Sequence, residues 1–353
     1  MTVCIASICV EPSGFIYIVA AADRMITSGD IEFEPDIDRA LGNKIHTLTP
    51  TIFALTSGDT GLQPDLVQNT REILFKTAGA ATNSWSVREA AEVYERCLKD
   101  TISNRLDKEV YGLFGLTAKT FVEKQSAMSR DHVEYILRMV AEYRIQSIQT
   151  AFAGIDTVNG AQTHPHIYVV DSQPGSQQFR CCDWESFAAV GGGARHAESQ
   201  FMQVGFHRFT TLGESIFLTY LAKKRAETAP GVGKGTDIAI IGNWNPSITF
   251  LGTAAMGEIE KIYKKQVTGE RKHWKQSAER AMKYVKGLTE PTKVAPTAST
   301  PPDGQSPASA PSSETPPSPL STNDSPSCWP RWGPASIRSP APRSPVPEVW
   351  PWC

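Results

Sequence analysis

The order of strand-like and helix-like segments restricts the possible fold of this chain more than any other feature. Period-two alternation and short β-branched runs, separated by Gly, Pro, Asn and Ser, predict strands. These strands cover residues 3–10, 15–22, 44–48, 52–56, 150–155, 166–171, 178–182, 187–190, 237–241 and 248–251. Because strands and helices come in blocks and do not alternate one by one, a doubly wound parallel sheet is disfavoured. The order favours an α+β chain in which two antiparallel sheets pack on each other beneath outer helical layers.

Helical spacing and capping signals place the helices between these blocks. Apolar residues recur at helical intervals over residues 62–74 and 133–143, whereas residues 107–128 have only a weak pattern. Ser86-Val-Arg-Glu89 and Thr211-Leu-Gly-Glu214 have the spacing of capping boxes and predict two helix starts. A last amphipathic helix, over residues 256–286, has a basic face that is typical of a solvated surface.

Composition excludes several classes of function. A net charge of −2 gives no electrostatic reason to expect nucleic acid or an anionic membrane as partner. The longest strongly apolar run, residues 15–22, is far shorter than the ~20 residues of a spanning helix, and no secretory signal is evident. The seven cysteines have no CxxC spacing and only one adjacent pair, Cys181-Cys182, which favours reduced thiols in a cytoplasm. The seven histidines lack metal spacing; His164 and His166 are predicted to be turn and surface residues.

The C-terminal part has the composition of a disordered tail. Of the 25 prolines, 17 lie in residues 291–353, mixed with Ser, Ala and Thr. Too few apolar side chains remain there to offset the entropy lost on ordering. Four tryptophans are unusual in such a tail and are compatible with a docking motif or a simple extension: Trp329, Trp332, Trp350 and Trp352.

The start of the chain carries one chemically notable residue. If Met1 is trimmed, Thr2 presents a free α-amine and a β-hydroxyl on one residue, and the amine can act as base for the hydroxyl. An α-amine has a reference pKa of roughly 7.7–8.0, which suits a general base near neutral pH. Many chains begin Met-Thr without using it, so only other residues can favour a catalytic role.

A series of short segments supplies that context. They are, in chain order, Thr2-Val-Cys-Ile-Ala, Ile18-Val-Ala-Ala-Ala-Asp23-Arg-Met-Ile-Thr27, Asn43-Lys44-Ile-His-Thr-Leu48, Leu55-Thr-Ser-Gly58-Asp59, Ala153-Gly-Ile-Asp156, His166-Ile-Tyr-Val-Val-Asp171, Ala189-Val-Gly-Gly-Gly193 and Gly235-Thr-Asp237-Ile-Ala-Ile240. In type and order they resemble the proteasome β-subunit family of N-terminal nucleophile hydrolases, including its bacterial and phage proteasome-like branch. The resemblance covers about residues 2–251 and implies a four-layer αββα sandwich.

The same resemblance implies a threonine-type hydrolase that cleaves peptide or amide bonds without metal or cofactor. Thr2 would be the nucleophile, Lys44 would favour the developing alkoxide, Asp23 would orient Lys44, and the Gly58 N–H would stabilise the oxyanion. Each of the last three also has a plain structural explanation: Asp23 as a turn cap, Lys44 as a solvated strand residue, and Gly58 as a residue that permits a positive φ. Peptide or protein substrates and self-association into rings or stacked oligomers are expected, with no nucleic-acid or membrane partner.

Three positions depart from the family pattern. Gly192 stands where active members carry a serine, and Ala229 and Val232 stand where they carry an aspartate and a serine. These losses keep a second reading open, a catalytically inactive assembly subunit; a small-molecule amidohydrolase with the same nucleophile is a third.

The resemblance and the composition together divide the chain. Residues 1–252 form the expected proteasome-like domain, with an insertion at about 105–147. Residues 253–290 form a helical extension, and residues 291–353 form the disordered tail.

Overall fold

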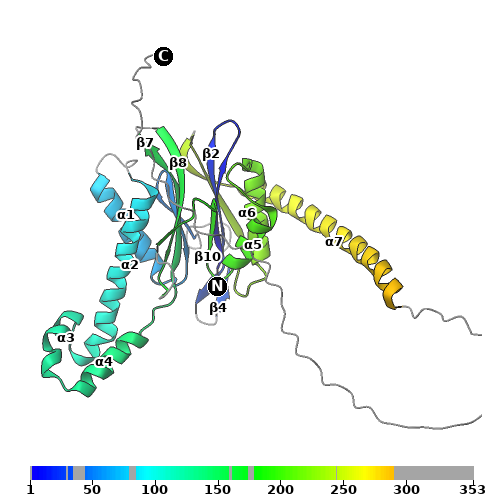
Figure 1. Cartoon of the computed structure of the whole chain (residues 1–353). Coiled ribbons are helices and arrows are strands. Elements are labelled where there is room, and N and C mark those ends of the chain that lie inside the picture. Colours follow the sequence, from blue (N-terminus) through cyan, green and yellow to red (C-terminus); the bar gives the residue numbers. More distant parts are fainter. Residues whose placement is uncertain are drawn as a thin grey trace, which may run out of the picture. The chain divides into compact units, whose positions relative to one another are not determined.

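Two five-stranded antiparallel sheets form the centre of the structure (Figure 1). The structure is a computed structural model, and it describes residues 2–28, 31–34, 44–78, 85–158, 161–173, 179–243 and 245–289. The first sheet has the order β10 (Phe187–Val190), β1 (Cys4–Val10), β2 (Ile16–Asp23), β11 (Thr236–Gly242), β12 (Asn245–Phe250). The second has the order β5 (Ile45–Thr49), β6 (Ile52–Ser57), β7 (Gln149–Val158), β8 (Ala161–Asp171), β9 (Phe179–Cys181). A small ribbon of β3 (Ile26–Ser28) and β4 (Ile31–Phe33) follows β2.

Two antiparallel hairpins connect strands that are consecutive in the sequence. β1 pairs with β2 along its whole length, from Cys4 opposite Ala22 to Val10 opposite Ile16. β5 and β6 form the second antiparallel pair. The α+β prediction with two antiparallel sheets is therefore confirmed.

Helices cover the outer face of each sheet. α1 (Gln63–Ala78) and α2 (Val87–Glu109) share a buried apolar cluster with β6, β7 and β8 of the second sheet. α5 (Ala194–Val204) and α6 (Leu212–Ala226) pack in the same way on β1 and β10 of the first sheet. The layers therefore run helix, sheet, sheet, helix (Figure 1).

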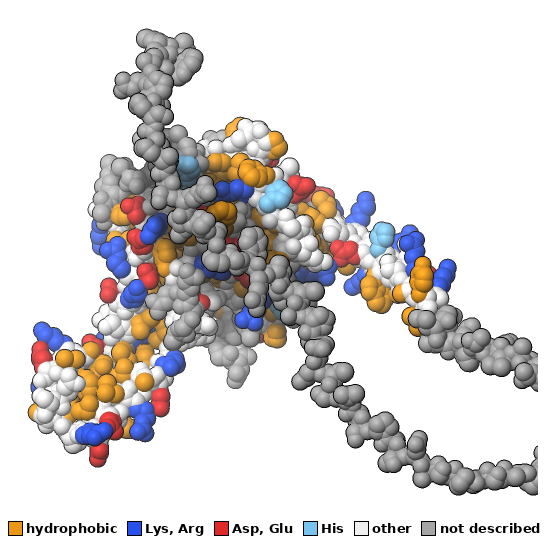
Figure 2. Space-filling view, in the orientation of Figure 1, with side chains coloured by type: hydrophobic (Ala, Val, Ile, Leu, Met, Phe, Trp, Pro, Cys, Tyr) orange, Lys and Arg blue, Asp and Glu red, His pale blue; other side chains and the backbone are white. Residues whose placement is uncertain are grey.

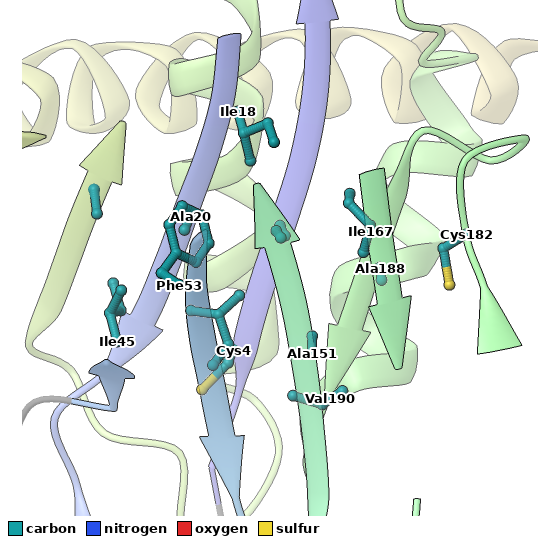
Figure 3. Packing of buried hydrophobic residues seen from close by; sticks show 14 of the residues in the cluster. Cys4, Ile18, Ala20, Ile45, Phe53, Ala151, Ile167, Cys182, Ala188 and Val190 are labelled. Atoms are coloured by element: carbon teal, nitrogen blue, oxygen red, sulfur yellow. The ribbon is translucent and has the colours of Figure 1, made fainter. Parts of the chain in front are cut away.

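The interior between the two sheets is filled by small and branched side chains. Figure 3 shows Cys4, Ala20, Phe53 and Ala151 in this layer, all of them fully buried. Alternate residues of β1 face opposite ways, because successive side chains of a strand point to opposite faces. Cys4 accordingly lies between the sheets, while Ile5 lies under α5 and α6.

Both predicted capping boxes are present. The Ser86 side chain accepts from the Glu89 N–H at the start of α2, and Thr211 accepts from the Glu214 N–H at the start of α6. In each box the glutamate side chain also accepts from the backbone N–H of the capping residue. Each box satisfies donors that a helix N-terminus otherwise leaves unpaired.

The segment between α2 and β7 is a helical arm with its own small apolar cluster. It contains η1 (Tyr111–Phe114), α3 (Ala118–Lys124), η2 (Gln125–Ala127) and α4 (Arg130–Glu142), and it lies within the predicted insertion at 105–147. Tyr111, Phe121 and Ile136 are its buried centre. Figure 2 shows hydrophobic side chains gathered over the arm. Because α3 and the η segments are short, they leave only the weak periodicity seen in the sequence.

The predicted C-terminal helix is α7 (Thr253–Thr289). Its first turns pack on the outer helical layer through Ile259 and Tyr263, and Glu270 pairs with Arg225 of α6. The chain divides into two units, Met1–Thr289 and Glu290–Cys353, and the predicted tail lies outside the described residues. None of the helices in the described ranges combines the length and apolar character required to cross a bilayer.

One local prediction is wrong in part. His164 and His166 lie within β8, paired with β7, and not in a turn, whereas His164 is exposed as predicted. Pro165 is compatible with this strand because β9 pairs only with residues 168–170, so β8 is an edge at Pro165. His166 is half-buried and donates from Nδ1 to Asp183 Oδ2 at 2.6 Å.

Candidate active site

Three segments that are distant in the sequence meet at Thr2. Thr2 precedes β1, Asp23 ends β2, and Lys44 precedes β5 in the other sheet. The Thr2 hydroxyl donates to Asp23 Oδ1 at 2.6 Å, and Lys44 Nζ donates to the same carboxylate oxygen at 2.8 Å. Lys44 Nζ also donates to Thr2 Oγ1. A hydroxyl, a carboxylate and an ammonium group are therefore in mutual contact.

Asp23 is fully buried, and its carboxylate accepts from five donors. Oδ1 accepts from Thr2, from Lys44 and from the Val3 N–H at 2.9 Å. Oδ2 accepts from the backbone N–H groups of Met25 at 3.1 Å and Gly233 at 3.0 Å. A buried carboxylate is costly unless it is paired and hydrogen-bonded, and these donors meet that requirement.

Lys44 is the cation of the site, and only 14% of its side chain is exposed. Its carbonyl accepts from the Thr56 N–H at 3.0 Å, which fixes its backbone against β6. At this depth its charge is screened less by water than the charge of a surface lysine.

The glycine run after β10 fixes the other side of Thr2. The Gly193 N–H donates to the Thr2 carbonyl at 3.1 Å. Gly191 has a φ of +95°, and its N–H donates to Gln149 Oε1 at 2.9 Å. Gln149 donates in turn to Asp171 at 2.8 Å, so a polar relay from β7 and β8 orients the turn.

Gly58 lies in the turn after β6, next to Ser57. Its φ is +117°, and a β-carbon on it would overlap the carbonyl oxygen of Ser147, so only glycine fits. Among the described residues no hydrogen bond links Gly58 to Thr2, Asp23 or Lys44. The structure thus brings three of the four predicted site residues into direct contact and places the fourth in a neighbouring turn.

A buried polar network supports that turn. Gln63 Nε2 donates to the Ser57 carbonyl at 3.0 Å, and the Tyr94 hydroxyl donates to Gln63 Oε1 at 2.9 Å. Thr150 Oγ1 donates to the Tyr94 hydroxyl at 2.9 Å. Burial raises the pKa of Tyr94, so its hydroxyl remains a donor at neutral pH.

The three departures from the family pattern lie close by. Gly192 is exposed, whereas Ala229 and Val232 are buried among the apolar residues beneath α5 and α6. Val232 lies against Gly193, whose β-carbon would be 3.0 Å from Val232 Cγ2. The loop that carries Val232 therefore reaches the site, but it contributes the Gly233 N–H and no carboxylate or hydroxyl.

Cys4, two residues after Thr2, is a fully buried thiol. Burial raises the pKa of the Cys4 thiol to about 12, although nearby Lys44 acts in the opposite direction. The thiolate is the reactive form of cysteine, so this thiol is inert at neutral pH.

Sequence reasoning missed three residues that contact the site or its turns: Gly233, Gln149 and Gln63. Gly233 and Gln149 act on residues far away in the chain, and no short motif marks them. Gln63 opens α1 directly after the glycine turn, and its position at a buried helix start is the one signal that could have indicated it.

No grouping of three His, Cys, Asp or Glu side chains within the described ranges is arranged to bind a metal ion. No family model matches the chain, and no curated protein sequence matches it. The fold and the geometry around Thr2 are therefore the observations on which a function can be proposed.

Proposed function

We propose that this chain is a threonine-type N-terminal nucleophile hydrolase that cleaves peptide or amide bonds. The supporting observation is the contact of Thr2 Oγ1 with both Asp23 Oδ1 and Lys44 Nζ at the start of a buried strand. The proposal also assigns the sandwich to the N-terminal nucleophile class that the sequence resembles.

Removal of Met1 would complete the reactive group. The Thr2 amine that is freed in this way would be the base. Thr2 Oγ forms a bond to the substrate carbonyl carbon as the hydroxyl proton passes to that amine, directly or through one water. The C–N bond of the substrate then breaks, and the leaving amine takes the proton. Water hydrolyses the resulting ester, which releases the acid and restores Thr2.

The charged groups would stabilise the reacting oxygens. Lys44 would lower the energy of negative charge on Thr2 Oγ, and the hydrogen bond to Asp23 holds the Lys44 ammonium group in place. The Gly58 N–H would serve the oxyanion, a contribution of about 3–4 kcal/mol for one such donor. The Gln63 network fixes the backbone that presents this N–H.

A covalent probe tests the proposal directly. A peptide epoxyketone reacts with a hydroxyl and an amine on the same residue, so it reports the complete N-terminal threonine. We expect the purified protein to gain one probe mass, located on the N-terminal peptide by mass spectrometry. Thr2→Val keeps the shape of the side chain without its hydroxyl and should gain none, while Thr2→Ser should still react.

Equal labelling of wild type and Thr2→Val would contradict the proposal, because the probe would then be reacting elsewhere. Absence of an adduct in wild type that starts at Thr2 would contradict it as well. Profiling of labelled protein on peptide and small amide substrates then separates a peptidase from a small-molecule amidohydrolase.

The second candidate function is an inactive assembly subunit with the same fold. Its supporting observation is that Gly192, Ala229 and Val232 offer no hydroxyl or carboxylate beside Thr2. Retention of Met1 in the intact mass of the purified protein would favour this candidate, because it blocks the amine.

Self-association into rings or stacked oligomers accompanies both candidates as a proposal, and so does a cytoplasmic location. Sedimentation of the purified chain over a series of micromolar concentrations tests the self-association. A monomer at every concentration in the series would contradict it.

A further inference from the structure

A second lysine is hydrogen-bonded to the loop that reaches the candidate site. Lys223 belongs to α6 and is fully buried. Its ammonium group donates to Glu227 Oε1 at 2.6 Å and to the carbonyl oxygens of Gly233 and Lys234, each at 2.8 Å. Three donors meet three acceptors, so the group is fully paired.

The loop that Lys223 binds is the one that reaches Asp23. The Gly233 N–H donates to Asp23 Oδ2 at 3.0 Å, while the carbonyl of the same residue accepts from Lys223. A β-carbon on Gly233 would lie 2.7 Å from Met25 Cβ and 2.8 Å from the Met25 N, so the loop runs tightly against the end of β2. One glycine therefore connects the buried ammonium group to the buried carboxylate.

We propose that Lys223 is a positioning residue for the candidate site: it fixes Gly233 against Asp23, so that the carboxylate keeps its orientation toward Thr2 and Lys44. This inference rests on the proposed function, because orientation of Asp23 matters for chemistry only if Thr2 is the nucleophile.

Burial makes this lysine costly, which argues against a role in packing alone. Burial lowers the pKa of Lys223, and the ion pair with Glu227 opposes that shift. An apolar side chain of similar length would fill the same space without a buried charge. What such a side chain cannot do is donate to two successive loop carbonyls.

The neighbouring lysine provides a matched control. Lys224 pairs with Glu227 at 3.0 Å and reaches the Lys234 carbonyl only at 3.4 Å, and no hydrogen bond between it and Gly233 occurs in the described part of the chain. Lys223→Met and Lys224→Met thus remove the same group from adjacent positions. Only the first change releases Gly233.

The experiment measures labelling by the epoxyketone in full-length wild type, Lys223→Met, Lys223→Gln and Lys224→Met. Lys223→Gln is a milder change that keeps a neutral donor in the pocket, in case Lys223→Met does not fold. The rate constant for inactivation, the probe concentration for half-maximal rate and the final labelling stoichiometry are determined separately. Hydrogen exchange of the Gly233 amide is followed in the same proteins.

We expect Lys223→Met to lower the inactivation rate constant about 10-fold, with half-maximal concentration and final stoichiometry within twofold of wild type. The inactivation rate constant of Lys223→Gln should lie between those of Lys223→Met and wild type, and that of Lys224→Met should equal the wild-type value. A general folding defect would instead reduce stoichiometry or weaken probe binding. The Gly233 amide should exchange at least 10-fold faster in Lys223→Met than in Lys224→Met.

Folded Lys223 variants that label at the wild-type rate would overturn the inference and leave the proposed function standing. So would a Gly233 amide that stays as protected as in Lys224→Met. If wild type takes no label, the proposed function fails instead, and the exchange rates alone decide whether Lys223 fixes Gly233.

Discussion

Gly191 and Thr2 lie so close together that no side chain fits between them. A β-carbon on Gly191 would overlap the carbonyl oxygen of Thr2 and would lie 2.7 Å from Ser57 Oγ. We expect Gly191→Ala to displace Thr2 and to lower the free energy of unfolding by about 3–5 kcal/mol, from overpacking and from a left-handed φ. Chemical denaturation measures this change, and probe labelling should fall at least 10-fold.

Gly14→Ala is the matched control for that substitution. Gly14 also has a positive φ, +85°, but a β-carbon there meets no atom within 4 Å. Gly14→Ala should lower the free energy of unfolding only by the backbone strain, about 1–2 kcal/mol, and should leave labelling unchanged. Equal effects at the two glycines would show that the approach to Thr2 is unimportant.

Asp23→Asn should impair both stability and labelling. The amide cannot accept at both positions, and its NH2 group would face donors such as Lys44 and the Val3 N–H. Breaking a buried ion pair from one side costs about 3–5 kcal/mol, so we expect a loss of that order in denaturant melts. Asp237→Asn, at a part-exposed pair with Arg24, should cost less than about 1 kcal/mol. A stable, normally reactive Asp23→Asn protein would refute the role assigned to the carboxylate.

Tyr94→Phe should destabilise the chain without altering the volume of its core. The change leaves Gln63 Oε1 without its donor and Thr150 without its acceptor, at a cost of about 1–3 kcal/mol. Because Gln63 fixes the Ser57 carbonyl, labelling should slow several-fold. Tyr135→Phe, at a tyrosine that is 52% exposed, serves as the control and should be close to neutral. A neutral Tyr94→Phe would mean that the network contributes nothing measurable.

His46 should make the protein less stable in acid. Burial, with a smaller effect of Arg71, lowers the pKa of His46 to about 4, below the value of about 6.5 in the unfolded chain. The unfolded chain therefore binds the proton first, and stability falls as the pH drops from about 6.5 toward 4, by at most roughly 3 kcal/mol. His46→Gln can still hydrogen-bond to Thr56 and should flatten this part of the stability profile. An unchanged acid slope in His46→Gln would contradict this assignment.

His166 should have the opposite effect on the pH dependence of stability. The hydrogen bond to Asp183, followed by the charges of Asp183 and Asp156, raises the pKa of His166 although burial and Arg208 oppose it. The stabilisation that charged His166 contributes is present below about pH 6.5 and is lost as the pH rises through the pKa of His166 in the folded protein. His166→Gln should therefore cost about 1 kcal/mol more at pH 5.5 than at pH 9, a modest figure because the pair is part-exposed. The same cost at both pH values would argue against the charged pair.

Local patterns predicted the elements of this fold well, because the forces that set them are local. Alternation marked β1 and β2, and the Ser86 and Thr211 boxes marked two helix starts. The pairing of β6 with β7 within the second sheet joins residues far apart in the chain, so the sequence indicated the layers and not the register.

Some residues of the candidate site could be predicted from the sequence, and others could not. Thr2, Asp23 and Lys44 each carry a reactive or charged side chain that can be recognised in a sequence, and the structure brings these three side chains into contact. Gly233 and Gln149 act through a backbone N–H and a side-chain amide, groups that occur everywhere in proteins. Lys223 is fully buried, and its acceptors in the loop after α6 include the carbonyl oxygens of Gly233 and Lys234, which no helical pattern reveals.

The helical arm has a consequence for how this protein could change. β6 and β7 are neighbours, with Ser57 opposite Gln149, and everything between 58 and 148 returns the chain to the adjacent strand. In polymer terms α1, α2 and the arm are one long closed loop, and the entropy of closing a loop grows only logarithmically with its length. Because the arm keeps its own apolar cluster around Tyr111 and Phe121, segments could be added or removed there while the strands below stay in register. A change in the length of the arm would therefore leave the pairing of Ser57 with Gln149, beside the candidate site, in place.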